Sequence, residues 1–376
     1  MEKRPNFQND KQTAEFFRKY ALDYTKEDLW GLAKHFYIIA CEVILKNRKN
    51  CPKKKEREKI AQKLINEAKM IKAKITERLN RILASDHQAK VINESVLEKP
   101  LKNCGFENII GQKSAKEHIM ECLIYPSKRP DIFKDLRAPA KGILLYGPPG
   151  NGKTMLARAI ACECQAKFFN LSSSSILSKY VGESQKMIRA LFKLARLLQP
   201  SIIFIDEIDS LLCSRSEGEA DNVRQIKTEF LLQFEGVATS KNEWVFVIGA
   251  TNRPYDLDSA VLRRFPKKVL VDTPTLQDRV EMIQLNIQKI HNTLKKNEVK
   301  IIAKALENFS ASDIITVIKE ASMMPIRGLG CSVITTNINN VPPVTKKDFL
   351  KAIDQISPCA SQSELKKLRK WGKSNS

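Results

Sequence analysis

The sequence Gly147-Pro148-Pro149-Gly150-Asn151-Gly152-Lys153-Thr154 follows directly after an apolar run at 143–146. The run predicts a buried strand, and residues 155–161 predict the start of a helix. A strand, a glycine-rich loop and a helix N-terminus in this order form a phosphate-binding P-loop. Because glycine lacks a Cβ atom, backbone N–H groups in such a loop can turn inward and hold an anion. The stretch therefore predicts a nucleotide site.

The side chains of Lys153 and Thr154 suit a polyphosphate and its metal ion. The Lys153 ammonium would reach the β- and γ-phosphates of ATP, and the Thr154 hydroxyl would ligate Mg²⁺. ATP and Mg²⁺ are therefore the predicted cofactors. The other residues expected around the cofactor are Gly147, Pro148, Pro149, Gly150, Asn151, Gly152 and Met155.

A second decisive stretch is Ile202-Ile203-Phe204-Ile205-Asp206-Glu207. Four apolar residues that end in paired carboxylates fit a central parallel strand with acids at its carboxyl end. Asp206 would hold Mg²⁺, partly through water, while Glu207 would orient or deprotonate an attacking water. A buried strand can also end in these two residues without catalysis, but the preceding P-loop favours the catalytic interpretation.

A third apolar run, 245–249, leads into Ala250-Thr251-Asn252-Arg253-Pro254, and Leu262-Arg263-Arg264-Phe265 follows. Asn252 is placed to sense or position the water near the γ-phosphate. Adjacent arginines often form a solvated surface pair, but a guanidinium also neutralises charge on a transferring phosphoryl group. The predicted catalytic residues are Lys153, Asp206, Glu207, Asn252, Arg263 and Arg264.

Composition narrows the class of protein and of partner. No apolar run approaches the roughly 18 residues of a membrane span, and the N-terminal sequence MEKRPNFQND is too polar for a secretory signal. Nine cysteines without a CxxC pair suit a reducing compartment. The net charge of +22 suggests a polyanionic partner, with a merely well-solvated basic surface as the alternative. A cytoplasmic protein is expected.

Hydrophobic periodicity divides the chain into five segments. Residues 1–84 are expected to be helical, with helices near 13–21, within 26–48 and across 60–83. This unit resembles the MIT domain, a three-helix docking module, and a plain helical oligomerisation arm is the alternative. Residues 85–104 are expected to be a short linker. An α/β nucleotide-binding subdomain at 105–272, a helical lid at 273–357 and a basic helix carrying Trp371 at 358–376 complete the prediction.

Taken in order, these motifs resemble the AAA family of ATPases over residues 105–376. Within that family the chain resembles the spastin-like, microtubule-severing group, as the stretches 150–157, 178–183 and 199–212 indicate. The resemblance implies a P-loop α/β core with a parallel sheet flanked by helices and a small helical lid. Family members usually carry glycine where this chain has Asn308 and Ala311, and close relatives outside the spastin-like group usually carry threonine at the position of Asn151.

The same resemblance implies an ATP-dependent homohexamer with ATP bound between protomers. Arg263 and Arg264 would then complete the site of the neighbouring protomer. On the first pore loop, Lys179, Tyr180 and Val181 would grip acidic tubulin C-terminal tails, which the net charge favours over nucleic acid. The stretch from Arg215 to Arg224 would correspond to the second and third pore loops. The expected enzyme is cytoskeleton-associated, with a perinuclear or nuclear location also open.

Two other functions fit the same residues. One is an ATPase that disassembles ESCRT-type membrane-remodelling filaments, recruited to ESCRT-III-type proteins by the N-terminal helical unit. The other is a microtubule-binding scaffold whose nucleotide site only regulates assembly. Basal and microtubule-stimulated ATP turnover separates the scaffold from the enzymes, and a severing assay beside a filament-disassembly assay separates the two enzymes.

Overall fold

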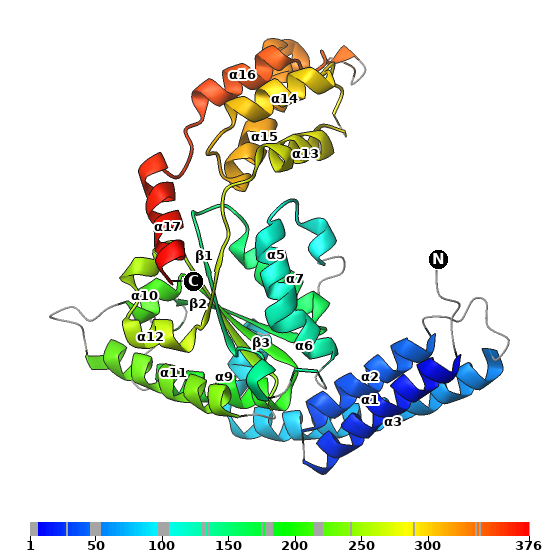
Figure 1. Ribbon diagram of the computed structural model, residues 1–376. Helices are drawn as coiled ribbons and strands as arrows, with labels where there is room; N and C mark the ends of the chain where they lie inside the picture. Colours follow the sequence, from blue (N-terminus) through cyan, green and yellow to red (C-terminus); the bar gives the residue numbers. More distant parts are fainter. Residues whose placement is uncertain are drawn as a thin grey trace.

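The computed structural model describes residues 7–27, 29–45, 54–96, 105–129, 132–133, 135–173, 176, 183–213, 221–240, 243–288, 290–334, 337 and 340–375. Figure 1 shows an N-terminal helical unit, an α/β core and a helical lid at the opposite end of the molecule from that unit. Within the described ranges, no helix is long and apolar enough to cross a membrane.

The N-terminal unit is a bundle of the three helices α1 (Phe7–Lys26), α2 (Trp30–Leu45) and α3 (Lys54–Ser85). Phe17 and Phe36 stack in its seam with ring centroids 6.3 Å apart. Arg57 is fully buried, and it donates to the Ile44 carbonyl and to Asp10 Oδ2, both at 2.8 Å. A paired and hydrogen-bonded guanidinium can be buried at acceptable cost. The three helices are those that the helical periodicity of the sequence predicts near 13–21, within 26–48 and across 60–83.

The unit packs directly on the core. Its buried apolar residues belong to the same continuous hydrophobic cluster as those of the sheet. Phe36 meets Trp244 edge-on with ring centroids 6.4 Å apart, and a Cβ atom on Gly31 would lie 2.2 Å from the Gln199 carbonyl oxygen. Gln199 lies two residues before β3 and Trp244 lies one residue before β4, so the unit covers the amino ends of those two strands.

The interval 85–104, predicted to be a linker, contains the nine-residue helix α4 (His87–Ser95). Asp86 caps it by accepting a hydrogen bond from the Ala89 N–H at 3.2 Å. Ala89 and Ile92 are fully buried, and α4 packs against α9 (Glu183–Leu197). The prediction was wrong here because a helix of two turns has too few apolar positions to show a clear period.

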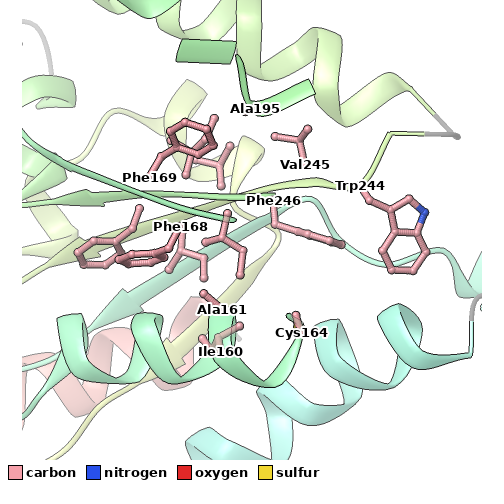
Figure 2. Packing of buried hydrophobic residues seen from close by; sticks show 14 of the residues in the cluster. Ile160, Ala161, Cys164, Phe168, Phe169, Ala195, Trp244, Val245 and Phe246 are labelled. Carbon is pink, nitrogen blue, oxygen red and sulfur yellow. The ribbon is translucent and has the colours of Figure 1, made fainter. Parts of the chain in front are cut away.

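The core is a five-stranded sheet in the order β2-β3-β4-β1-β5, and every pairing is parallel. Figure 2 shows Phe168 and Phe169, neighbours on one strand, on opposite faces of this sheet, as strand geometry requires. Helices cover both faces, which confirms the predicted parallel α/β core. The strands are β1 (Gly142–Tyr146), β2 (Lys167–Ser172), β3 (Ser201–Asp206), β4 (Val245–Thr251) and β5 (Lys267–Leu270). The core helices besides α9 are α5 (Lys113–Ile119), α6 (Tyr125–Lys128), α7 (Lys153–Glu163), α10 (Ile208–Leu212), α11 (Asp221–Thr239) and α12 (Ser259–Arg264).

The lid consists of α13 (Leu276–Ile287), α14 (Lys296–Ala305), α15 (Ala311–Gly328) and α16 (Lys346–Gln355). It has a hydrophobic cluster of its own, separate from that of the sheet. Capping boxes at Thr275, Ser310 and Thr345 begin three of its helices. The lid is therefore built around a core of its own.

The C-terminal helix α17 (Gln362–Asn375) leaves the lid and returns to the core, as the red helix in Figure 1 shows. Trp371 meets Tyr146, the last residue of β1, edge-on with ring centroids 4.8 Å apart. Arg369 donates to both carboxylate oxygens of Asp272 at 2.8 and 3.1 Å. The helix therefore connects the lid to the strand that enters the P-loop.

Candidate nucleotide site

The P-loop joins the end of β1 to the start of α7. Gly150 and Gly152 both have a left-handed backbone, with φ of 76° and 81°. Residues with a Cβ atom rarely adopt this conformation. A Cβ atom on Gly150 would also lie 2.7 Å from Ser310 Oγ of the lid. Both glycines are therefore required by backbone geometry.

Lys153 begins α7, and its side chain turns back into the loop. Its Nζ donates to the carbonyls of Gly147 and Pro148 at 2.9 and 3.0 Å and to Asn252 Oδ1 at 2.6 Å. Burial lowers its pKa to about 8, against the opposing influence of Asp206 and Asp209. All three acceptors are uncharged, so within the described part of the chain the ammonium has no hydrogen-bonded counter-charge. An anion at the loop would stabilise it.

Thr154 and Asp206 lie side by side. Thr154 Oγ1 donates to Asp206 Oδ2 at 2.8 Å, and Asp206 ends β3. Hydroxyl and carboxylate oxygens are ligands that Mg²⁺ accepts, and Mg²⁺ usually takes its other ligands from phosphate and water. The donor set fits a nucleotide-bound Mg²⁺.

Glu207 follows Asp206 with an unusual backbone. Its φ and ψ are 50° and 47°, in the left-handed region, which costs a non-glycine residue about 1–3 kcal/mol and is often found at functional sites. The side chain is exposed, and its carboxylate has no hydrogen-bond or ion-pair partner among the residues that the structure describes. A free carboxylate next to the metal ligand can accept a proton from water.

Asn252 follows the last residue of β4 and accepts from Lys153, so the structure brings these two predicted residues together. The end of this strand is fixed by two contacts that sequence reasoning missed. Thr251 Oγ1 donates to Asp209 Oδ1 at 2.6 Å, and the Arg253 N–H donates to Thr251 Oγ1 at 2.9 Å. Asp209 lies two residues after Glu207, but sequence spacing alone did not connect it to β4.

The predicted arginines are the last two residues of α12. Arg264 pairs with Glu235 on α11 through Nη2 and Oε2 at 2.8 Å, whereas Arg263 is exposed and without a polar partner in the described part of the chain. Arg224 is exposed on α11. The predicted pore-loop residues Lys179, Tyr180, Val181 and Arg215 lie outside the described residues.

A contact between the P-loop and the lid was not predicted. Asn151 is 5% exposed, and its Oδ1 accepts from the Ala311 N–H at 3.0 Å. The Ser312 N–H donates to the Gly150 carbonyl at 2.9 Å. Asn308, shortly before α15, has a φ of 67°. Glycine suits this left-handed position best and asparagine tolerates it, which explains why asparagine can stand at a position where the family resemblance predicts glycine.

Comparison with known proteins identifies the domains. The model described as "ATPase family associated with various cellular activities (AAA)" matches residues 143–273. The model "Vps4 C terminal oligomerisation domain" matches residues 334–374. Both matches lie in the part of the chain that carries the P-loop, the lid and α17.

Similar chains extend this match. A spastin homolog of Caenorhabditis elegans is 45% identical over 302 residues, 79% of this chain and 59% of that protein. Spastin of Danio rerio is 46% identical over 269 residues, 71% of this chain and 47% of that protein. This chain thus spans about half the length of the curated relatives that it matches.

Solved structures agree with the fold. A structure of the FIGL-1 AAA domain in complex with ADP is 39% identical with a TM-score of 0.71, and the match covers 77% of this chain and 96% of that one. A structure described under katanin self-assembly is 31% identical with a TM-score of 0.62, covering 76% and 96%. An AAA domain implies nucleotide binding, as the geometry of the P-loop does. The chain belongs to the AAA family of ATPases.

Proposed function

We propose that this chain is a Mg²⁺-dependent ATPase that severs microtubules as a homohexameric ring, by drawing acidic tubulin C-terminal tails into a central pore. The observation that best supports hydrolysis is the convergence of three chain segments. Lys153 Nζ lies 2.6 Å from Asn252 Oδ1, and Thr154 Oγ1 lies 2.8 Å from Asp206 Oδ2. The groups that we propose for binding phosphate and metal therefore lie together with Asn252 at the carboxyl ends of β1, β3 and β4.

Each residue has a separate task in this proposal. Bound Mg²⁺–ATP would supply the transferring phosphoryl group and the metal charge that neutralises it. Lys153 and the loop N–H groups hold the phosphates, and Thr154 and Asp206 hold the metal ion. Glu207 takes the proton of the attacking water, since its carboxylate is unpaired and adjacent to Asp206. Asn252 keeps the Lys153 ammonium directed at the phosphates.

The arginines would act on the next protomer. Arg263 is exposed and unpartnered in the described part of the chain, so it is available to a neighbouring site, whereas Arg264 must first leave Glu235. The match to the Vps4 oligomerisation domain supports an oligomer. Head-to-tail contacts that close produce a ring.

The substrate proposal rests on resemblance and charge. The spastin relatives support severing, and the net charge of +22 supports an acidic partner. ATP turnover and the severing of labelled microtubules would be measured together, with microtubules stripped of their acidic tails by proteolysis as the control. We expect turnover to rise with intact microtubules, and only these to be cut. ATP turnover without severing would contradict the substrate, and microtubule binding without turnover would favour the scaffold.

One surface of the N-terminal unit supports a docking role beside the ATPase. A groove of about 230 Å³ lies between α2 and α3, with an apolar floor that includes Tyr37 and Leu64. Lys34, Lys69 and Lys72 also line it, which favours a helix with acidic flanks. Helical tails of ESCRT-III-type proteins are the proposed partners. Binding of such a tail peptide to the chain, and its loss in Leu64→Asp, tests this role.

A further inference from the structure

We infer that Ser173 is a positioning residue for Glu207. Its buried hydroxyl hydrogen-bonds to the backbone that carries the catalytic carboxylate. This inference rests on the proposed ATP hydrolysis. Ser173 follows directly after β2, and it is 1% exposed. Its Oγ donates to the Glu207 carbonyl at 2.7 Å and lies 2.9 Å from the Asp206 carbonyl. One hydroxyl hydrogen is thus shared between the carbonyl groups of the two peptides that flank the α-carbon of Glu207.

The backbone of Glu207 needs such support. Its left-handed conformation, with φ 50° and ψ 47°, persists only where surrounding contacts determine it. The Glu207 N–H donates to Asp206 Oδ1 at 3.0 Å, and the Ser210 N–H donates to the Glu207 carbonyl at 2.9 Å. Both of these contacts come from residues within three positions of Glu207. The Ser173 hydroxyl, 34 positions away in the sequence, adds a long-range contact.

The register of β2 against β3 explains how Ser173, which follows β2, reaches the Glu207 peptide. Ser172 is the partner of Asp206 in the parallel pairing of β2 with β3, so Ser173 stands beside Glu207 one position later. Ser172 is exposed whereas Ser173 is buried, because successive side chains point to opposite sides. The Ser173 hydroxyl bonds to the backbone carbonyls of Asp206 and Glu207. It would therefore affect catalysis through the backbone that carries the Glu207 carboxylate.

A matched control exists at the other end of β3. Ser201 is also fully buried, and its Oγ also donates to a backbone carbonyl, that of Ala195, at 2.8 Å. Ser201 begins β3 and Glu207 follows its last residue. Removing either hydroxyl removes buried side-chain hydrogen bonding to the backbone, but the Ser201 hydroxyl bonds to Ala195 whereas the Ser173 hydroxyl supports the Glu207 peptide.

The steady-state test compares Ser173→Ala with Ser201→Ala. We expect Ser173→Ala to lower kcat for ATP by about five- to tenfold, the effect of one net hydrogen bond on a rate, with KM changed less than about twofold. Ser201→Ala should keep kcat within about twofold of the parent. Ser173→Thr, which retains the hydroxyl, should recover most of the rate, and Ser173→Cys, a weaker donor of similar size, should lie between. Parental kcat in Ser173→Ala, or an equal loss in Ser201→Ala, would overturn the inference.

A double-mutant cycle shows whether Ser173 acts through Glu207. In a Glu207→Gln background, whose residual turnover does not use the carboxylate, adding Ser173→Ala should cause no further loss. Losses that multiply would place the action of Ser173 elsewhere and contradict the inference.

Hydrogen exchange provides a readout that does not depend on turnover. In the nucleotide-free protein, Ser173→Ala should increase amide exchange in the peptide covering 207–212 by about fivefold, while Ser201→Ala leaves this peptide unchanged. If the parent protein hydrolyses no ATP, the proposed function fails. Unchanged exchange at 207–212 in Ser173→Ala is the separate result that refutes the positioning role.

Discussion

The side-chain oxygen of Asn151 in the P-loop accepts a hydrogen bond from the backbone N–H of Ala311, the first residue of the lid helix α15, at 3.0 Å. A second bond, from Ser312 N–H to the Gly150 carbonyl at 2.9 Å, runs beside it. The lid therefore touches the phosphate loop directly. A change in the lid's position would be transmitted to the loop that binds the nucleotide.

Asn151→Ala should weaken this connection and, with it, nucleotide binding. A buried hydrogen bond contributes about 1 kcal/mol net, so we expect the Kd for ATP to rise by about fivefold. Titration calorimetry measures it. Asn286→Ala is the control, because it removes a side-chain hydrogen bond to the Met282 carbonyl within the lid alone. It should leave the Kd unchanged. Equal Kd values for Asn151→Ala and the parent would show that the contact has no role in binding.

Asn308 tests the left-handed position before α15. The φ angle of Asn308 is 67°. Asn308→Ala should lower the free energy of unfolding by about 1 kcal/mol, because a side chain with a Cβ atom and no compensating polar group disfavours the left-handed conformation. Asn308→Gly should remain within about 0.5 kcal/mol of the parent. Urea denaturation monitored by circular dichroism provides the comparison. Alanine and glycine variants of equal stability would argue against backbone strain as the reason.

The buried Lys153 should make nucleotide binding dependent on pH. Its pKa is lowered to about 8 in the free protein, and bound phosphate favours the charged form, so the pKa rises on binding. Below pH 8 the Lys153 side chain is already charged in the free protein, so its titration does not change the affinity for ATP with pH. Above pH 8 affinity should fall by up to about tenfold per pH unit.

Calorimetry at pH 8.5 in two buffers of different ionisation enthalpy measures the linked proton. We expect net proton uptake on binding of ATP. Lys153→Arg, which stays charged throughout this range, should show no such uptake if it binds. An affinity that is constant between pH 7 and 9.5, without proton uptake, would contradict the shifted pKa.

Arg263 and Arg264 should differ in effect. Arg263→Ala should lower ATP turnover by about 10³-fold, the lower end for arginines that stabilise phosphoryl transfer. Arg264→Ala should cost less, because Arg264 is engaged with Glu235 at 2.8 Å. Nucleotide binding should persist in both variants.

Mixing Arg263→Ala with Lys153→Ala should restore part of the activity, because a mixed ring pairs an intact P-loop with an intact arginine. Glu235→Gln is the companion variant, since it releases Arg264 without removing it. If mixed rings form but no mixture exceeds its parents, action on the neighbouring protomer loses its support.

Local sequence patterns determined much of this protein. Glycine spacing in 147–154 specified the P-loop because its backbone conformation depends on the loop itself. The apolar run ending at Asp206 specified a buried parallel strand, and a period near four residues specified the long helices of the N-terminal unit. The order of these motifs was sufficient for the AAA family.

Tertiary structure decided which distant residues meet. Asn151 and Ala311 are separated by 160 positions, and Ser173 and Glu207 by 34. Phe36 and Trp244 pack the N-terminal unit against the core. The sequence predicted only a short linker, residues 85–104, between them. Spacing and periodicity report the conformation of neighbouring residues, whereas these contacts depend on how whole elements pack. A single sequence contains the apolar faces that drive this packing but does not state which faces pair.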